Sequence, residues 1–442
     1  MQTLSKKDLI SMSFLFFSTL FGAGNLIFPP YLGHYAGEHV WTSLIGFILS
    51  DTGIFLSAVI VIAKTGGIEV LTNRVSSLFT IIFSFLIYIC LGPGLAVPRA
   101  GSLAYEMGLQ QFLPKNIVGS PLPLLIYTIV FFAAVFWFSM SPSKLVDRFG
   151  KVLTPILLIL IGTIFVRSLF VPLDSQATAI GNYKDHPIIQ GFLDGYLTMD
   201  GLAAFVCGVV IINSLKAKGI HHNQALTKYM IYSGIGAGII LGSVYAILAY
   251  LGASSSMLDK PENGAQILIY VTNRLFGSYG NIILGLIFTV ACLCVSIVLV
   301  IACSQFFAKN VSRVSYKQWV VILCFASATV ANLGLTQIIA ICGPLLSALF
   351  PIFIVLVVLG IFHLHIQRFR YVYPVTVLGT ALFSMIDLVN QTFLKGSFTS
   401  VLSRIPLYSE GIGFIMPAVV FFVISCFMGE NPTVTVVKKK AA

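Results

Sequence analysis

The sequence predicts an all-α integral membrane protein with about twelve transmembrane helices, of which the first and the sixth are broken. Of the 442 residues, 57% are hydrophobic and only 9% are charged, whereas soluble proteins average about 25% charged residues. Nearly uncharged stretches of roughly 20 residues recur, and each is long enough to cross a hydrocarbon core of ~30 Å. Two of these stretches contain glycine and polar residues that weaken or interrupt a helix.

Charged residues separate the apolar stretches and set the bounds of the predicted helices. The predicted spans are 10–30, 41–63, 77–98, 122–140, 152–171, 188–214, 229–252, 280–306, 318–334, 338–362, 372–390 and 411–428. The stretch 264–277 is too short to span a membrane and predicts a re-entrant or interfacial helix.

The first span contains the strongest break signal, between Ser18 and Pro30. Two glycines flank an alanine at residues 22–24, an asparagine follows, and Pro29 and Pro30 are adjacent. Each of these weakens the helical hydrogen-bond ladder, and freed backbone groups in a membrane must meet protein, water or a ligand. Such breaks usually line a binding cavity, so residues 22–25 are interpreted as half of a substrate site.

The sixth span opens with a second break signal at residues 191–201, where three glycines and two aspartates lie among apolar residues. Two units of five helices, each beginning with a broken helix, indicate an inverted repeat, because an odd number of spans turns the second unit over. We therefore expect one transmembrane domain over 1–442, with repeat one at 10–171, repeat two at 188–362, and two further helices at 372–428.

The third span ends in a polar stretch rich in glycine and proline, residues 91–101, which includes Arg99. Two interpretations stay open for Arg99. The side chain extends to the outer membrane interface, where its charge is solvated, or it has a substrate or gating role.

Most of the 26 Lys and Arg residues fall on one side of the predicted membrane. This side receives Lys6, Lys7, Lys64, Arg74, Lys144, Arg148, Lys151, Lys216, Lys218, Lys228, Lys309, Arg313, Lys317, Arg368, Arg370 and Lys438 to Lys440. Positive charge collects in cytoplasmic loops, so both termini are expected to be cytoplasmic. The same rule explains the net charge of +11 without a nucleic-acid partner.

The histidines and cysteines do not predict an enzyme. All seven histidines fall in or near predicted loops without a nucleophile or metal constellation beside them. The eight cysteines lie in apolar stretches without CxxC spacing, which is typical of buried packing residues. We expect no cofactor and no metal beyond a possible Na⁺.

The ordered motifs resemble the bacterial branched-chain amino acid carriers, the BrnQ-type LIVCS family of symporters. They are FGAGNLIFPP, LGPGLAVPRAGSLAYE, SPSKLVDRFGKVLTP, GYLTMDGLAAFVCGVVIIN and the CxQFFAK end of the eighth span. The resemblance covers most of the chain. It implies the leucine-transporter-like fold, with two inverted five-helix repeats and two further helices, in the bacterial inner (plasma) membrane. It also implies import of leucine, isoleucine or valine, driven by Na⁺ or H⁺.

An amino acid zwitterion suits the two predicted breaks. Freed N–H groups at Gly22, Ala23 and Gly24 would bind the carboxylate at a helix N-terminus. Carbonyl groups around Tyr196, Leu197, Thr198 and Met199, with those of Leu20 and Phe21, would accept hydrogen bonds from the ammonium group. Tyr196 and Met199 are also candidates for the apolar pocket that holds the aliphatic side chain.

Four polar side chains inside predicted helices are further candidates. The Asn25 amide, directly after the first break, would bind a cation or backbone. Asp200 would serve substrate binding or proton coupling, or alternatively cap a half-helix. Asp51 and Asp387 carry the same functional interpretation with less support, because Asp51 could equally bond to neighbouring helices and Asp387 lies outside the two predicted repeats.

The predicted sodium site departs from the family pattern. The carbonyl groups of Ser18, Phe21 and Ala291, with a hydroxyl from Ser296 or Thr289, would form it. By the family register, however, the two usual hydroxyl positions are Cys294 and Val295, which are poor ligands for a hard cation. This departure favours protons as the coupling ion.

The leading hypothesis is thus a secondary active importer of branched-chain amino acids. An exporter of the same fold stays open, because ion gradients set the direction of transport. A channel would need a continuous polar lining, whereas the polar groups here cluster at breaks. A sensor would normally carry a soluble output domain, and the longest charged terminus is the short segment 436–440.

Overall fold

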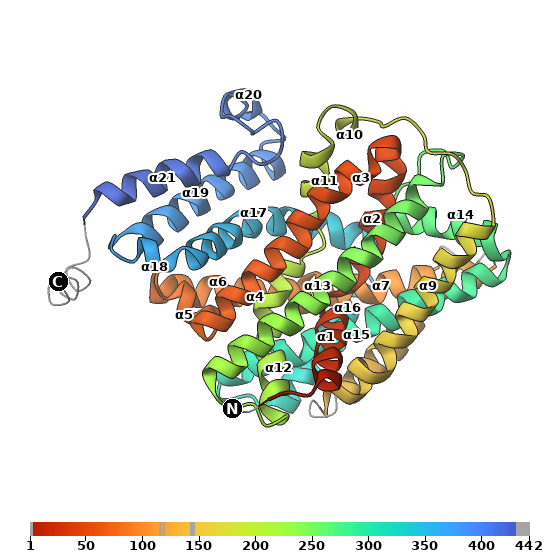
Figure 1. Ribbon diagram of the computed structural model, residues 1–442, viewed down its shortest axis with the longest axis horizontal. Coiled ribbons are helices and arrows are strands. Elements are labelled where there is room, and N and C mark those ends of the chain that lie inside the picture. Colours follow the sequence, from red (N-terminus) through yellow and green to blue (C-terminus); the bar gives the residue numbers. More distant parts are fainter. Residues whose placement is uncertain (1–2, 115–116, 118–119, 142–145, 430–442) are drawn as a thin grey trace. The chain divides into compact units, whose positions relative to one another are not determined.

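The computed structural model describes residues 3–114, 117, 120–141 and 146–429. Throughout these residues every regular element is a helix (Figure 1). By length and composition, nine of the described helical segments could cross a membrane, and two apolar helices, α16 (Tyr316–Ala331) and α21 (Ile415–Phe427), are shorter. The number of twelve spans therefore stays a prediction. Lys144 and Lys438 to Lys440, which entered the orientation prediction, lie outside the described residues.

The chain folds into two compact units, one of Met1–Val59 with Tyr88–Ile339 and one of Ile60–Ile87 with Ala340–Ala442. Their boundaries fall within α4 (Ile54–Thr65), α6 (Ser77–Ile89) and α17 (Leu335–Ile361). The first unit also holds α1 (Lys6–Leu20), α2 (Ala23–Ala36), α3 (Val40–Ile48), α7 (Ala96–Gly108), α8 (Pro121–Ser139), α9 (Thr154–Phe170), α10 (Asn182–Asp185), α11 (Pro187–Tyr196), α12 (Asp200–Ala217), α13 (Asn223–Ala253), α14 (Gly264–Phe276), α15 (Tyr279–Asn310) and α16 (Tyr316–Ala331). The second unit also holds α5 (Ile68–Thr72), α18 (His363–Ile366), α19 (Val372–Thr392), α20 (Thr399–Leu402) and α21 (Ile415–Phe427).

Both predicted helix breaks are present. The first span is divided into α1 and α2, because Phe21 and Gly22 adopt extended conformations between them. The sixth span is divided into α11 and α12, and Met199 between them has a left-handed backbone with φ of 75°. A left-handed methionine is uncommon, so the surrounding packing must hold it in place.

The third and last predicted spans have wrong bounds. The third does not end at residue 98 but continues through a π-helical turn, Cys90–Gly94, into α7. Gly92 leaves helical geometry there, so the glycines and proline bend the helix instead of ending it. The last begins at Ile415 rather than 411, because Gly411 has a positive φ of 76°.

The broken helices pack on the second helix of the other predicted repeat. In the first unit α1 and α2 contact α13, while α11 contacts α3 and α12 contacts the π-helical turn Leu49–Gly53. Figure 1 shows α2 and α13 running beside each other. An inverted repeat predicts this reciprocal packing, in which the broken helix of each repeat lies on the second helix of the other.

Glycines bring these helices into direct backbone contact. A Cβ atom added to Gly191 in α11 would lie 1.9 Å from the carbonyl oxygen of Ser43 in α3, and one added to Gly46 would lie 2.0 Å from that of Ile188. The α2–α13 pair has the same feature, with Gly33 against Ala249. Close backbone approach at small residues is how membrane helices associate without a hydrophobic driving force between them.

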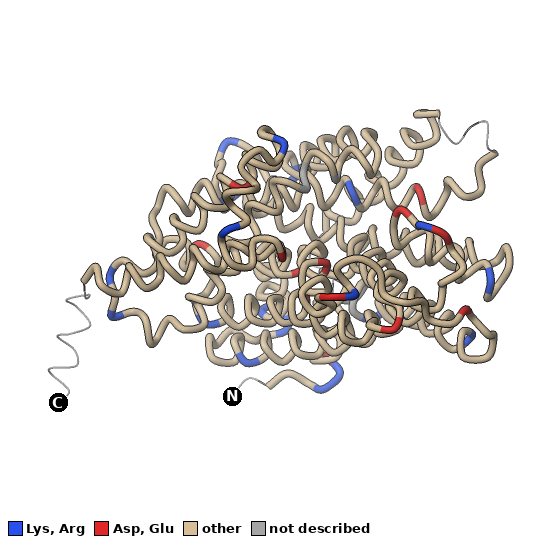
Figure 2. Tube along the Cα trace, turned by 90° about the horizontal axis from the view of Figure 1, so that it is seen from above, with Lys and Arg blue, Asp and Glu red and all other residues tan. Residues whose placement is uncertain are grey.

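Apolar side chains cover the outside of the helices. Trp137 in α8 is 74% exposed and Ile239 in α13 is 66% exposed, as is typical of lipid-facing surfaces. Charged residues are sparse along the described part of the trace (Figure 2). The described cysteines are free thiols, six of them buried and Cys426 half-buried, as packing residues would be; the side chain of Cys342 is not described.

We predict that Gly191→Val prevents α11 from packing on α3, because the added side chain would overlap the Ser43 carbonyl group. The purified protein should aggregate or unfold in size-exclusion chromatography. Gly162→Val in α9 is the matched control, since nothing lies within 4 Å of its added Cβ atom. A monodisperse Gly191→Val protein of wild-type stability would contradict the close contact.

Candidate functional site

The two helix breaks meet in the first unit. A Cβ atom added to Gly24, at the start of α2, would lie 3.1 Å from the Cα atom of Thr198 in the second break. A Cβ atom added to Gly22 would lie 2.8 Å from Val295 Cγ1 in α15. Any larger side chain at Gly24 would overlap the second break, and any larger side chain at Gly22 would overlap α15. Close packing therefore requires these glycines, in addition to their effect on the helix.

Asn25 joins the first break to the second. Its Oδ1 accepts a hydrogen bond from the Gly22 N–H group (3.0 Å), which satisfies one of the unpaired donors at the start of α2. Its Nδ2 donates to Oδ2 of Asp200 (2.8 Å) and to the hydroxyl of Tyr245 in α13 (2.6 Å). One buried amide thus holds together α2, α12 and α13.

Asp200 and Asp51 form a buried pair of carboxyl groups. Asp200 is 2% exposed and opens α12, and Asp51 is 1% exposed in the π-helical turn Leu49–Gly53. Thr198 donates to Asp51 Oδ1 (2.6 Å), and Tyr245 donates to Asp200 Oδ2 (3.4 Å). The two carboxyl groups are close enough to influence each other electrostatically. Two negative charges in such a place repel each other strongly unless they share a proton or another cation.

Arg99 lies at the same place, so the interpretation that it extends to the membrane interface is wrong. The kink at Gly92 precedes α7, and the Arg99 side chain is only 6% exposed. Its Nη2 atom would lie 3.1 Å from a Cβ atom added to Gly24, and its Nε atom has no hydrogen-bond partner.

A cavity of about 30 Å³ lies between the breaks, with room for on the order of two water molecules. Both breaks, the bend before α7, and α15 contribute to its lining. The lining residues are Leu20, Gly22, Ala23, Gly24, Asn25, Leu91, Ala96, Arg99, Thr198, Met199, Asp200, Ala203, Val295 and Leu299.

Most of the residues predicted for the substrate lie on this cavity, and Tyr196 is the exception. Gly22, Ala23, Gly24, Asn25, Thr198, Met199 and Asp200 all line it. Tyr196 is the last residue of α11, is half-buried, and does not line the cavity. Its carbonyl oxygen accepts a hydrogen bond from the Met199 N–H group (3.3 Å). It does not line the cavity because the turn after α11 is tight.

None of the residues predicted for a sodium ion lines the cavity, although all are buried. They are Ser18, Phe21, Ala291, Cys294 and Ser296. The Ser18 hydroxyl donates to the Leu15 carbonyl group (2.9 Å), and the Ser296 hydroxyl has no hydrogen-bond partner. Thr289, the alternative to Ser296, instead faces Tyr127 and Gly108. Val295, between Cys294 and Ser296, is the residue of this stretch that reaches the cavity.

Two members of the site were missed or given little support by sequence reasoning. Tyr245 is one of four tyrosines in α13, and nothing in the sequence distinguishes it from the other three. Asp51 stands out as a carboxylate in an apolar stretch, but its partner Thr198 is far away in the sequence. A search for polar side chains deep inside predicted spans would have found both.

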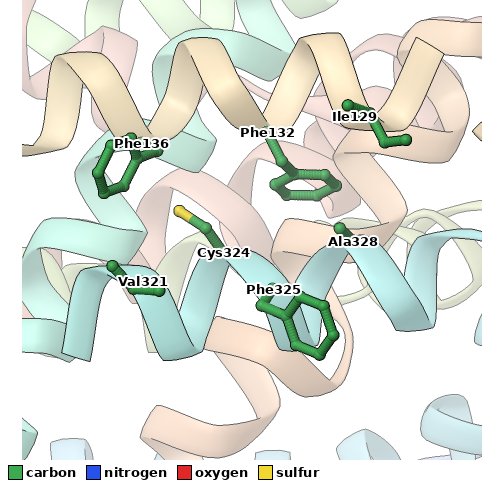
Figure 3. Close-up of a pocket in the computed structure, with 7 residues that line it drawn as sticks. All are labelled: Ile129, Phe132, Phe136, Val321, Cys324, Phe325 and Ala328. Atoms are coloured by element: carbon green, nitrogen blue, oxygen red, sulfur yellow. The ribbon is translucent and has the colours of Figure 1, made fainter. Parts of the chain in front are cut away.

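A larger groove in the same unit lacks the chemistry for a zwitterion. It has a volume of about 290 Å³ and lies between α8 and α16, where the side chains of the two helices face each other (Figure 3). Its lining is apolar apart from the Cys324 thiol. The lining residues are Ile129, Phe132, Phe136, Val321, Cys324, Phe325 and Ala328.

Known proteins resemble this chain over nearly its full length. The model of a family described as "Branched-chain amino acid transport protein" matches residues 5–431. The branched-chain amino acid permease BraB of Bacillus subtilis is 42% identical, with 97% of this chain and 98% of that protein covered. The branched-chain amino acid permease BrnQ of Escherichia coli K12 is 35% identical, with 96% and 95% covered.

Two solved structures show the fold. Mhp1, a nucleobase-cation-symport-1 family transporter, superposes with a TM-score of 0.62 at 11% identity and covers 95% of this chain and 91% of its own. MhsT superposes with a TM-score of 0.50 at 15% identity and covers 96% and 99%. The predicted leucine-transporter-like fold is confirmed.

We predict that Asn25→Ala destabilises the protein, because it leaves buried groups of Gly22, Asp200 and Tyr245 with fewer partners. Each such loss costs roughly 1–3 kcal/mol. The melting temperature in detergent should fall by several degrees, as measured by thermal unfolding. Asn310→Ala is the matched control, since Asn310 is exposed and its side chain donates to the Phe306 carbonyl group of its own helix (2.9 Å). Equal melting temperatures would argue against the network.

Proposed function

Because this chain belongs to the branched-chain amino acid transport protein family, we propose that it is a symporter that imports leucine, isoleucine and valine. The family and its permease members make it a multi-pass membrane transporter rather than an enzyme. The observation that carries the substrate proposal is the cavity between two broken helices, with polar groups at the breaks and apolar side chains around them.

The aliphatic side chain of the substrate would lie on the apolar part of the lining. That part is formed by Leu20, Leu91, Ala96, Met199, Ala203, Val295 and Leu299. A cavity of about 30 Å³ is smaller than a leucine side chain, so the half-helices and α15 must separate to admit it. Movement of the broken helices is also what alternating access requires.

The ammonium group of the substrate would approach Asp200. Its carboxylate lines the cavity and already accepts hydrogen bonds from Asn25 and Tyr245. Of the two sequence interpretations of Asp200, substrate binding or coupling and helix capping, the first is supported by its place on the cavity. Helix capping would not explain why Asp51 lies nearby, or why Asp200 accepts hydrogen bonds from α2 and α13.

We propose a proton as the coupling ion. Arg99 contributes one positive charge and the Asp51–Asp200 pair up to two negative charges, so one added cation makes the group neutral. A proton shared by two adjacent carboxyl groups meets this need directly. A sodium ion would need several oxygen ligands, and the hydroxyl-bearing positions predicted for α15 do not reach the cavity.

We further propose the bacterial inner membrane as the location, with both termini cytoplasmic. The distribution of Lys and Arg supports this orientation, and an inwardly directed proton gradient then favours import. We also propose two repeats, at 10–171 and 188–362, followed by two further helices at 372–428. The basis is that each repeat would begin with a broken helix, and the packing of α1 and α2 on α13 agrees with this division.

We predict that labelled leucine accumulates in proteoliposomes under an inward proton gradient without Na⁺, but not under a sodium gradient at equal pH. Accumulation driven only by Na⁺ would overturn the proton proposal and leave the transporter intact. Equilibration without accumulation would indicate a channel.

The direction of transport is tested in whole cells. Cells that express the protein should take up more leucine than cells that do not, and faster leucine efflux instead would indicate an exporter.

We predict that Asp51→Asn lowers the proton-driven accumulation of leucine at least tenfold. Leucine exchange between the two sides of the membrane should persist. The amide keeps the hydrogen bond with Thr198 but cannot share a proton with Asp200. Asp387→Asn in α19 is the matched control, because Asp387 bonds to Tyr408 and Gln391 and is not among the residues that line the cavity. Undiminished accumulation by Asp51→Asn would remove the pair from the coupling step.

We predict that Gly24→Val abolishes leucine binding in a protein that still inserts into the membrane. The valine side chain would displace Arg99 and fill the space beside Thr198. Gly242→Val in α13 is the control, since its added Cβ atom meets only Ile48 at 3.9 Å. Normal uptake by Gly24→Val would show that the first break serves only helix packing.

A further inference from the structure

Arg99 is an unusual residue because it is a buried cation inside a membrane helix. It lies in the first turn of α7 behind the kink at Gly92, and its side chain is 6% exposed. A cation inside a membrane-spanning helix is costly unless it is paired or solvated. The fold must therefore provide an anion, or leave a place for one.

No carboxylate of the described residues forms an ion pair with Arg99. The ion pairs found among the described residues include Lys218 with Asp8 and Arg274 with Asp174, and Arg99 takes part in none of them. The Nε atom of Arg99 has no hydrogen-bond partner. Asp200 lines the same cavity and attracts Arg99 electrostatically, but its hydrogen bonds go to Asn25 and Tyr245.

The backbone donors predicted for the substrate carboxylate are in part already used. The Gly22 N–H group donates to the Asn25 side chain (3.0 Å) and is not available to a ligand. The start of α2 therefore offers fewer free donors than the sequence suggested. The guanidinium group of Arg99 lies beside Gly24 on the same cavity and supplies the missing donors.

On these grounds, and resting on the proposed function, we infer that Arg99 binds the α-carboxylate of the transported amino acid. A guanidinium group presents parallel N–H donors that match a carboxylate, and such charge-assisted pairs are stronger than neutral hydrogen bonds. The substrate would then lie between Arg99, at its carboxylate, and Asp200, at its ammonium group. Arg99 thereby selects α-amino acids over amines of the same shape.

The test compares leucine with leucinol, which keeps the ammonium group and side chain but has a hydroxymethyl group in place of the carboxylate. Affinities of the full-length protein are measured by titration calorimetry in detergent. Wild type should bind leucine roughly 30-fold or more tightly than leucinol. In Arg99→Gln the affinity for leucine should fall to near that for leucinol, while the affinity for leucinol changes less than threefold.

Arg167→Gln is the matched control, because Arg167 is exposed at the end of α9 and its Nε atom donates to the Leu275 carbonyl group (3.4 Å). It should keep the full preference for leucine. Arg99→Lys keeps the charge without the paired donors and should show an intermediate preference. An Arg99→Gln protein that still prefers leucine as strongly as wild type would overturn the inference. Wild type that binds neither compound would instead defeat the proposed function.

A second experiment uses only the wild-type protein, so it tests the inference even if the Arg99 variants do not fold. Phenylglyoxal, which reacts with guanidinium groups, is applied to the wild-type protein, and modification of Arg99 is followed by mass spectrometry. Leucine should protect Arg99 at least fivefold and leucinol should not, while Arg167 reacts equally under both conditions. Equal protection of Arg99 by leucine and leucinol would overturn the inference.

Discussion

The structure depends on one constraint, that backbone groups freed by a broken membrane helix must find partners inside the protein. The breaks at residues 21–22 and 197–199 satisfy it by facing each other. Asn25 supplies the first partner by accepting from Gly22, and it ties the break to Asp200 and Tyr245. Glycine at position 24 then permits the contact with Thr198, so the local sequence and the tertiary contact require each other.

Charge imposes a second constraint on the same volume. Arg99, Asp51 and Asp200 come from three different helical segments, and each is less than a tenth exposed. Isolated charges would be costly there, so the cluster is stable only when opposite charges balance. In the proposed mechanism a zwitterion adds no net charge and a single proton completes the balance, so the same few side chains would link substrate binding to ion coupling.

Local residue chemistry predicted the breaks because helix interruption is a local property. Gly22, Gly24 and Pro29 disrupt the helix wherever the chain lies, and so does the glycine-rich stretch before Asp200. The same reasoning failed for the third span, where glycine and proline bend the helix at a π-helical turn and the chain continues as α7. A local rule marks irregular backbone, but neighbouring helices decide whether the helix ends or bends.

The sequence by itself determined a helical membrane protein, the two breaks, and the family to which the ordered motifs belong, since these depend on composition and on short stretches. Only the tertiary structure decided which polar side chains share the cavity. Asp51 meets Asp200, Tyr245 meets Asn25, and Arg99 turns inward, because helices far apart in the chain pack closely at glycines. No local pattern encodes those distances, and the chemistry of the site follows from them.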